Sequence, residues 1–165
     1  MIGKNLKKLS HEKTKCRFKK NIGIRRLFNN LLHSISKSAM ISSKIRVFIH
    51  SLRGVKFENM NTVFIGEDVI IDKMNPQNVK IGDRCLIAAG VKIFTHYVDT
   101  KNLSNHESYH FRFYDGNVII EEDVFIGANA VIAKPVKIGK GSIIGANVVV
   151  SKNIEPGSVY VGEKK

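Results

Sequence analysis

Histidines are the side chains in this sequence best suited to acid–base chemistry near neutral pH, because an imidazole has an ordinary pKa near ~6.5. His96 ends the segment Val91-Lys-Ile-Phe-Thr-His96, and as a neutral base it could take the proton from a hydroxyl that attacks an acyl carbonyl. The other interpretation is a surface histidine at a turn. A catalytic base would also need an acceptor that orients its second ring nitrogen, and Asp72 or Asp99 could supply it.

The elements that must position His96 are revealed by a repeat with a period of six. Six consecutive blocks keep register and begin at Ile120, Ile126, Ile132, Ile138, Ile144 and Val150. Upstream, a second run begins its blocks at Ile81, Ile87 and Ile93, and a third at Ile65 and Ile71. The longer stretches between the runs are insertions. A fixed short period of this kind is typical of a solenoid.

Within each block, position one is aliphatic, position two is often Gly or Ala, and position five is small or aliphatic. This pattern predicts a short strand and a tight turn per block, with the first residue filling the axis, the glycine permitting the turn and the fifth residue packing beside it. Three blocks would close a triangular coil. An α-helix is a poor alternative, since a stripe of period six drifts around a helix of 3.6 residues per turn. We therefore predict an all-β solenoid over residues 55–165, with a loop insertion at 97–117.

Residues 1–54 differ from the repeats in both pattern and charge. An amphipathic helix is predicted by the spacing of Ile24, Leu27, Phe28, Leu31, Leu32 and Ile35, and a second apolar cluster runs from Ala39 to Leu52. Residues 1–50 hold 13 Lys and Arg against the single acid Glu12. We expect this basic helical segment to cap the open end of the solenoid. The alternative is that it lies flat on an anionic membrane.

The repeat blocks, the segment ending at His96 and the insertion after it together resemble the hexapeptide-repeat acyltransferase superfamily over about residues 55 to 162. The layout is similar to the maltose and galactoside O-acetyltransferases and to their relatives in capsular and exopolysaccharide biosynthesis. This resemblance implies a left-handed parallel β-helix, a homotrimer, acetyl-CoA as acyl donor, and a sugar or glycan hydroxyl as acceptor. In the family, the insertion reaches a neighbouring subunit, so that the active site is shared.

The resemblance also implies roles for individual residues. His96 stands where the family has its general base. A serine commonly follows the Ile-Gly that corresponds to Ile126-Gly127, but this sequence has Ala128 there, which leaves a backbone N–H as the only contact. The family holds the pantetheine arm of CoA through an Ile-Gly-Ala turn and the next Ser/Thr-Lys pair, here Ala146 and Ser151-Lys152. Lys152 could also pair with a CoA phosphate.

No metal is expected in this site. His106 and His110 are four residues apart, which invites a zinc interpretation, and a related carbonic anhydrase branch of the fold binds zinc with three histidines. That site needs one histidine on one coil and a close pair on the next, whereas His96 precedes His106 by only 10 residues. Cys16 and Cys85 lie in different regions without ligand-like spacing, so we expect free thiols.

Two other interpretations keep part of this scheme. The acceptor could be serine or a xenobiotic, although about 54 residues are too few for the helical domain usual in serine acetyltransferases, and the chain has no tryptophan, unlike most xenobiotic acetyltransferases. Alternatively, the solenoid could be a non-enzymatic scaffold that binds an anionic membrane or a protein. We expect no nucleic acid partner. Because residues 1–20 lack the apolar stretch of a signal peptide, we expect the cytoplasm as the compartment.

Overall fold

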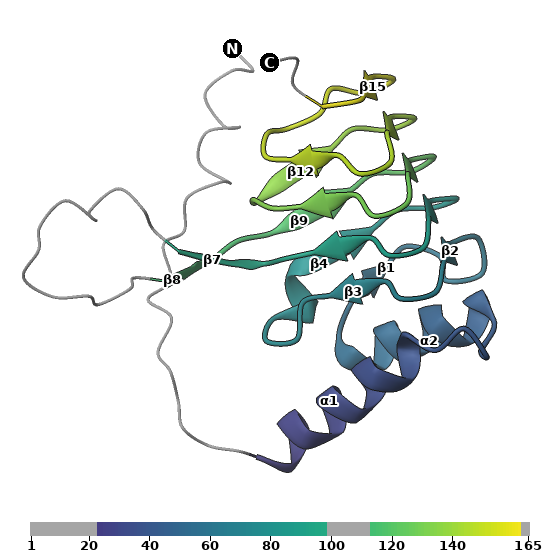
Figure 1. The fold of residues 1–165 in the computed structure, drawn as a ribbon, viewed down its shortest axis with the longest axis vertical. Coiled ribbons are helices and arrows are strands. Elements are labelled where there is room, and N and C mark those ends of the chain that lie inside the picture. The colour runs from purple at the N-terminus through teal and green to yellow at the C-terminus, as the bar shows by residue number, and fades with distance from the viewer. Residues whose placement is uncertain (1–22, 99–112, 163–165) are drawn as a thin grey trace, which may run out of the picture.

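The structure, a computed structural model, describes residues 23–98 and 113–162. Its main body is a stack of coils whose short parallel strands form three sheets, and the two helices lie at one end of the stack (Figure 1). The first sheet contains β1 (Lys56–Phe57), β4 (Val79–Ile81), β9 (Val118–Ile120) and β12 (Val136–Ile138). The second contains β2 (Phe64–Ile65), β5 (Leu86–Ile87), β10 (Phe125–Ile126), β13 (Ile143–Ile144) and β15 (Val159–Tyr160). The third contains β3 (Ile70–Ile71), β6 (Lys92–Ile93), β11 (Val131–Ile132) and β14 (Val149–Val150).

The chain visits the three sheets in a fixed order, so each coil has three corners. We call them the first corner (first to second sheet), the second corner (second to third sheet) and the third corner (third to first sheet). At the third corner, η1 (Pro76–Asn78) precedes β4, and the antiparallel pair β7 (His96–Val98) and β8 (Phe113–Asp115) leaves the stack after β6. The predicted insertion therefore begins and ends as a paired ribbon.

The core confirms the predicted period of six. The residues at position one are fully buried along the axis: Ile65, Ile71, Ile81, Ile87, Ile93, Ile120, Ile126, Ile132, Ile138 and Ile144. Position one pairs with position one on the next coil, as in Ile65 with Ile87 and Ile126 with Ile144. Each coil thus stacks its aliphatic residues on those of its neighbours, about 5 Å away.

The glycines at position two do not have the predicted role. Gly66, Gly82, Gly127 and Gly139 are absent from the left-handed region. A Cβ on any of them would come within 2.5–2.6 Å of a backbone nitrogen in the adjacent coil, so these glycines allow close approach between coils. The turn is made at position four, where φ is between +51° and +72° at Asp68, Arg84, Gly90, Asp123, Asn129, Gly141 and Asn147.

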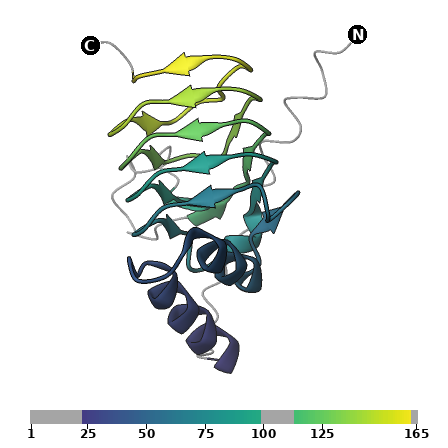
Figure 2. The same cartoon turned by 90° about the vertical axis from the view of Figure 1, so that its right-hand side faces the viewer.

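Two helices cover the first coil: α1 (Ile24–Ser36) and α2 (Ser43–Arg53) (Figure 2). The arginines of α2 bind backbone carbonyls at the open end of the stack. Arg46 donates to the carbonyl of Ile65 at 3.2 Å, and Arg53 donates to those of Ile71 and Asp72, both at 2.8 Å. These groups have no further coil to pair with, so the helix supplies the partners that they need. The predicted cap is therefore present. The division of the chain into domains at residue 54 stays a prediction.

Both helices bury polar side chains toward the solenoid, contrary to the usual arrangement of an amphipathic helix. The buried polar residues are His33 and Ser36 in α1 and Arg46, His50 and Arg53 in α2, where they lie beside the buried apolar residues Val47 and Ile49. The apolar stripe predicted from the sequence is exposed instead, apart from Leu32. The capping contacts explain this reversal, because a row of unpaired carbonyls attracts donors rather than apolar groups. Within the described ranges, no helix is long and apolar enough to cross a bilayer.

Candidate active site

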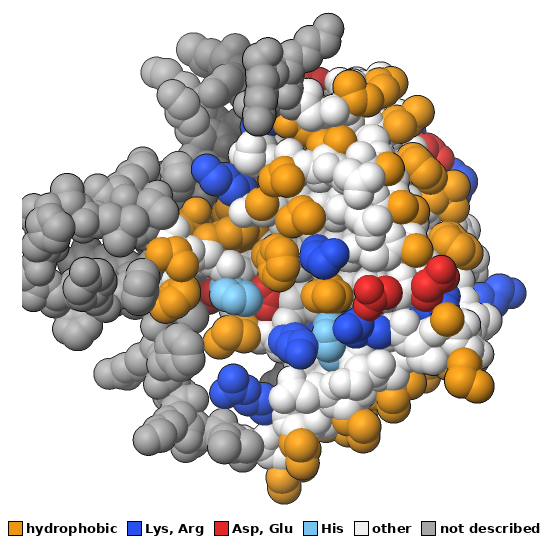
Figure 3. All heavy atoms as spheres, in the orientation of Figure 1, with side chains coloured by type: hydrophobic (Ala, Val, Ile, Leu, Met, Phe, Trp, Pro, Cys, Tyr) orange, Lys and Arg blue, Asp and Glu red, His pale blue; other side chains and the backbone are white. Residues whose placement is uncertain are grey.

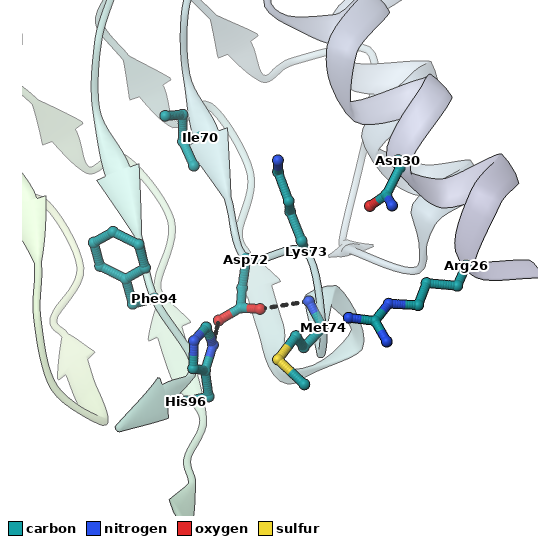
Figure 4. A pocket seen from close by; sticks show the side chains of 8 residues that line it. All are labelled: Arg26, Asn30, Ile70, Asp72, Lys73, Met74, Phe94 and His96. Carbon is teal, nitrogen blue, oxygen red and sulfur yellow. Dashed lines mark hydrogen bonds and ion pairs between the residues drawn. The ribbon is translucent and has the colours of Figure 1, made fainter. Parts of the chain in front are cut away.

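His96 lies at the third corner, next to the carboxylate of Asp72. Its Nδ1 is 2.5 Å from Oδ2 of Asp72, and the two side chains face one another in Figure 4. Strand pairing produces this proximity: Ile71 pairs with Ile93, so the residues that follow the two strands lie at the same corner of adjacent coils. Of the two carboxylates considered from the sequence, Asp72 therefore contacts His96, whereas Asp99 lies outside the described residues.

The carboxylate of Asp72 is surrounded by hydrogen-bond donors. Oδ1 accepts from the backbone N–H groups of Met74 at 2.7 Å and Asn75 at 3.2 Å, and Oδ2 accepts from that of Thr95 at 2.8 Å as well as from His96. Burial alone would raise the pKa of Asp72, but the hydrogen bonds from Thr95, Met74 and His96 outweigh it and hold the pKa below its ordinary value. Asp72 is therefore an ionised acceptor.

The ionised carboxylate fixes the protonation pattern of the imidazole. A carboxylate can only accept, so Nδ1 of His96 donates its proton to Asp72, and in the neutral imidazole Nε2 then bears the lone pair. The His96 side chain is 35% exposed while that of Asp72 is fully buried, so the base is accessible and its partner is not. This is the arrangement that general base catalysis requires.

A second set of contacts holds the backbone around this pair. Arg53 binds the Asp72 carbonyl, and its Nε donates at 2.9 Å to Asn29 on α1. Asn29 in turn donates to the carbonyl of Lys73 at 2.8 Å. Burial lowers the pKa of Arg53 to about 10, partly offset by the charge of Asp72, so the guanidinium stays charged. Residues of both helices therefore hold the backbone of the Asp72 loop through its carbonyl groups.

A pocket of about 380 Å³ opens in front of His96, between α1 and the third sheet. Its wall combines the coil side chains Ile70, Asp72, Lys73, Met74, Phe94 and His96 with Arg26 and Asn30 of α1 (Figure 4). Basic side chains gather on this face, where α1 meets the lower coils (Figure 3). The contribution of α1 to this wall was missed from the sequence, because helix periodicity does not say which loop a helix will face.

The residues predicted to bind CoA lie at two different corners. Ser151 and Lys152 follow β14 at the third corner, two coils beyond His96, which is about 10 Å along the axis. Ala128 and Ala146 lie at the second corner, before the strands of the third sheet, whereas the third corner lies after these strands. Within one chain, the structure therefore groups Ser151 and Lys152 with His96 and separates both alanines from it. The roles of all four stay predictions.

The two alanines have the features expected of main-chain contacts. Each is at position three of its block, and neither backbone N–H has a hydrogen-bond partner among the described residues. Asn147 donates to the Ala128 carbonyl at 2.8 Å, which joins the two turns. Lys152 has its ammonium 5.6 Å from the centre of the Tyr160 ring. The two alanine turns thus offer two backbone donors on adjacent coils, and Lys152 offers a cation at the third corner.

The insertion is anchored to the third corner by aromatic residues at its two ends. Tyr97 is buried and donates to the carbonyl of Phe94, and its ring lies 5.3 Å from that of Tyr114. His106 and His110 lie outside the described residues. Within residues 23–98 and 113–162, no group of three potential metal ligands is present. Cys85 is a buried free thiol, and burial raises its pKa to about 11.

Residues 117–152 match the family described as "Bacterial transferase hexapeptide (six repeats)", and residues 62–94 match "Hexapeptide repeat of succinyl-transferase". This chain is 51% identical to a 2,3,4,5-tetrahydropyridine-2,6-dicarboxylate N-acetyltransferase of Staphylococcus aureus over 45 residues, which are 27% of the chain. The match spans only 19% of that protein. The two family matches both lie in the repeats.

Similar solved structures share the fold over most of the chain. A hexapeptide-repeat acetyltransferase from Vibrio cholerae has a TM-score of 0.61 at 24% identity, covering 84% of this chain and 85% of its own. A maltose O-acetyltransferase from Clostridium difficile 630 has a TM-score of 0.53 at 20% identity, covering 82% and 80%. A galactoside acetyltransferase in complex with coenzyme A has a TM-score of 0.55 at 25% identity, covering 82% and 74%. The three parallel sheets of this chain fit the left-handed β-helix that the family resemblance implies.

Proposed function

We propose that this chain, which belongs with the hexapeptide-repeat acetyltransferases in its repeats and its fold, transfers an acetyl group from acetyl-CoA to a hydroxyl of a sugar or glycan precursor. The coils would then wind left-handed, as in that family. The observation that supports this most is the accessible His96 imidazole held by a buried carboxylate, beside a pocket. The similarity to a galactoside acetyltransferase that binds coenzyme A supports the donor.

The reaction follows from the protonation pattern of His96. Nε2 takes the proton of the acceptor hydroxyl as its oxygen attacks the thioester carbonyl, and the imidazolium that forms is stabilised by Asp72. The tetrahedral intermediate then breaks the C–S bond, and the proton passes from His96 to the thiolate of CoA. A backbone N–H near the carbonyl would stabilise the oxyanion, and we assign this role to Ala128.

Acetyl-CoA fits the available donors and charge. The N–H group of Ala146, which has no partner among the described residues, could bind an amide carbonyl of the pantetheine arm, and the hydroxyl of Ser151 could add a further contact. Lys152 would pair with a phosphate of CoA. Within one chain these contacts lie at two different corners, so one CoA molecule would meet all of them only where two subunits are in contact.

The separation of His96 from the two alanines supports an active site shared between subunits, and hence the homotrimer that the family resemblance implies. The second sheet offers a surface for such contacts. Its outward side chains form an apolar ladder in which each residue pairs with the next: Phe64, Leu86, Phe125, Ile143 and Val159. They are 40–66% exposed. A second copy packed beside this face would bury the ladder.

The acceptor would enter the pocket in front of His96. Arg26 and Lys73 bring two cationic side chains to the wall. The carboxylate of Asp72 already accepts hydrogen bonds from four donors. Acceptors with a carboxylate or phosphate near the reacting hydroxyl are therefore favoured. Sugar hydroxyls without such a group would bind more weakly.

The test is release of free CoA thiol from acetyl-CoA in the presence of galactosides, maltose, acidic sugars and nucleotide sugars. His96→Ala should lower the rate by ~10² or more with an active acceptor. Unchanged turnover in this variant would remove His96 from the mechanism. The panel should include amino sugars, because the curated relative with 51% identity over 45 residues is an N-acetyltransferase. Acetylation of amines but not of alcohols would replace the proposed O-acetyl transfer.

A further inference from the structure

The end of the solenoid covered by α1 and α2 displays a large apolar surface. On α1 it consists of Ile24, Leu27, Phe28, Leu31 and Ile35, and on α2 of Ile45, Phe48 and Leu52. These side chains are 42–89% exposed, and Figure 3 shows hydrophobic side chains along the lower edge of the molecule. We call them the helical apolar surface. An exposed surface of this kind on a folded chain indicates a contact with something outside it.

The helical apolar surface cannot be buried by a simple rotation of the helices. The opposite side of α2 holds Arg46 and Arg53, which bind the carbonyls of the first coil. The opposite side of α1 holds Asn29, which joins Arg53 to the Asp72 loop. Turning either helix inward would break these buried hydrogen bonds, each loss leaving a buried polar group unpaired. The apolar side therefore faces outward as a consequence of the cap.

The segment that contains both helices carries charges of one sign, although Lys37 at the end of α1 pairs with Asp68 of the first coil. From residue 13 to residue 57 the sequence contains 12 Lys and Arg and no Asp or Glu. Residues 1–22 alone contain eight Lys and Arg against one acid. Exposed Arg26 and Lys44 belong to the same two helices as the helical apolar surface. A partner that complements both features must be apolar and negatively charged.

We propose that the helical apolar surface binds the surface of an anionic lipid bilayer, with the apolar side chains of α1 and α2 among the acyl chains and the basic residues at the headgroups. Amphipathic helices with Leu and Phe on one side and Lys or Arg nearby bind interfaces in this way. A second copy of this chain is a poorer occupant, since it would bring two predominantly basic helical segments together. Residues 1–22 are poorer for the same reason. This proposal does not depend on the acyltransferase activity.

The experiment is co-sedimentation of the full-length chain with vesicles of phosphatidylcholine alone or with about one third phosphatidylglycerol. We expect binding to the anionic vesicles, weak binding to the neutral ones, and weaker binding as salt is raised. Leu27→Ser with Leu31→Ser should lower the partition coefficient at least ~10-fold, because each leucine loses apolar contact. Both leucines are mostly exposed, so the core is unaffected.

Met60→Ser with Val149→Ser is the matched control, since these residues are 44% and 54% exposed and lie outside the helices. The control should bind as the unaltered chain does. Equal sedimentation of the leucine variant and the unaltered chain would overturn the proposal, as would equal binding to neutral and anionic vesicles. Light scattering without vesicles should give the same mass for both. A lower mass for the leucine variant would show that another copy covers the surface, and would also overturn the proposal.

Discussion

Replacing Asp72 by asparagine tests the proposed base most sharply, because the side chain keeps its shape and loses only its charge and one acceptor oxygen. Four donors converge on the two carboxylate oxygens of Asp72. The amide group of asparagine must place its NH₂ against one pair of them. If this NH₂ group faces His96, the imidazole must adopt the tautomer that has its lone pair on Nδ1 and its proton on Nε2. That tautomer cannot accept the proton of a substrate.

The magnitude follows from the charge that the carboxylate supplies as His96 becomes an imidazolium. With the charge centres about 4 Å apart and an effective dielectric constant of about 20, the attraction is about 4 kcal/mol. A loss of this size in the transition state corresponds to a rate factor of ~10³. The amide that faces two N–H donors should also destabilise the fold by about 1–3 kcal/mol. The loss of rate and the loss of stability both arise because the hydrogen-bond donors around Asp72 require a carboxylate.

The assay is kcat for CoA release at saturating acetyl-CoA, with the best acceptor of the panel, together with thermal unfolding. Asp68→Asn is the matched control: Asp68 is also an aspartate of a coil corner, at φ 51°, a conformation that asparagine adopts readily, and it pairs with Lys37 rather than with His96. The control should keep its activity. If folded Asp72→Asn retains kcat within about threefold of the unaltered chain, Asp72 does not set the tautomer of the base, and our reasoning about His96 is wrong.

Three further predictions concern the coils, the cap and the donor site. Gly127→Ala would place a Cβ 2.6 Å from a backbone nitrogen of the next coil and should cost about 1–3 kcal/mol, whereas in Gly145→Ala the nearest atoms lie at 3.4 Å and the melting temperature should change little. Burial, then neighbouring positive charge, lowers the pKa of His50 to about 3, so the folded chain binds fewer protons than the unfolded chain below pH ~6.5. The contribution of His50 should be full above that pH and fall as the pH drops toward 3, by about 2 kcal/mol at pH 5, and His50→Gln should remove this part of the dependence in thermal unfolding, while His33, whose pKa is lowered to about 4, keeps its own part. Lys152→Ala should raise KM for acetyl-CoA about fivefold without changing kcat, while Lys80→Ala should not; an unchanged KM would exclude the phosphate contact.

The repeat and the corner of His96 could be predicted from the sequence because a period of six defines both the axis and the register. Once Ile71 and Ile93 occupy the same position in their blocks, the residues after them must lie at one corner. For that reason Asp72 could be considered as the partner of His96 before any coordinates. The role of the glycines at position two could not be predicted, since the repeat does not reveal how closely adjacent coils approach.

The side of each helix that faces the solenoid could not be predicted from the sequence, for a different reason. Periodicity located α1 and its apolar stripe, and the usual rule turns such a stripe inward. The rule fails here because the surface to be covered is the end of a β-stack, whose exposed carbonyls require Arg46 and Arg53. The positions of Arg26 and Asn30 in the pocket wall follow from that same packing.

The arginine cap also has a consequence for assembly. A coil end with unpaired strands could accept the strands of another solenoid and extend the stack without limit. By occupying the carbonyls of Ile65 and Ile71, α2 closes this end of the stack to growth into filaments. A chain shortened to the repeats would keep the isoleucines of the axis, lose Val47 of α2 from the core and lose this barrier, so we expect it to polymerise end to end before it unfolds.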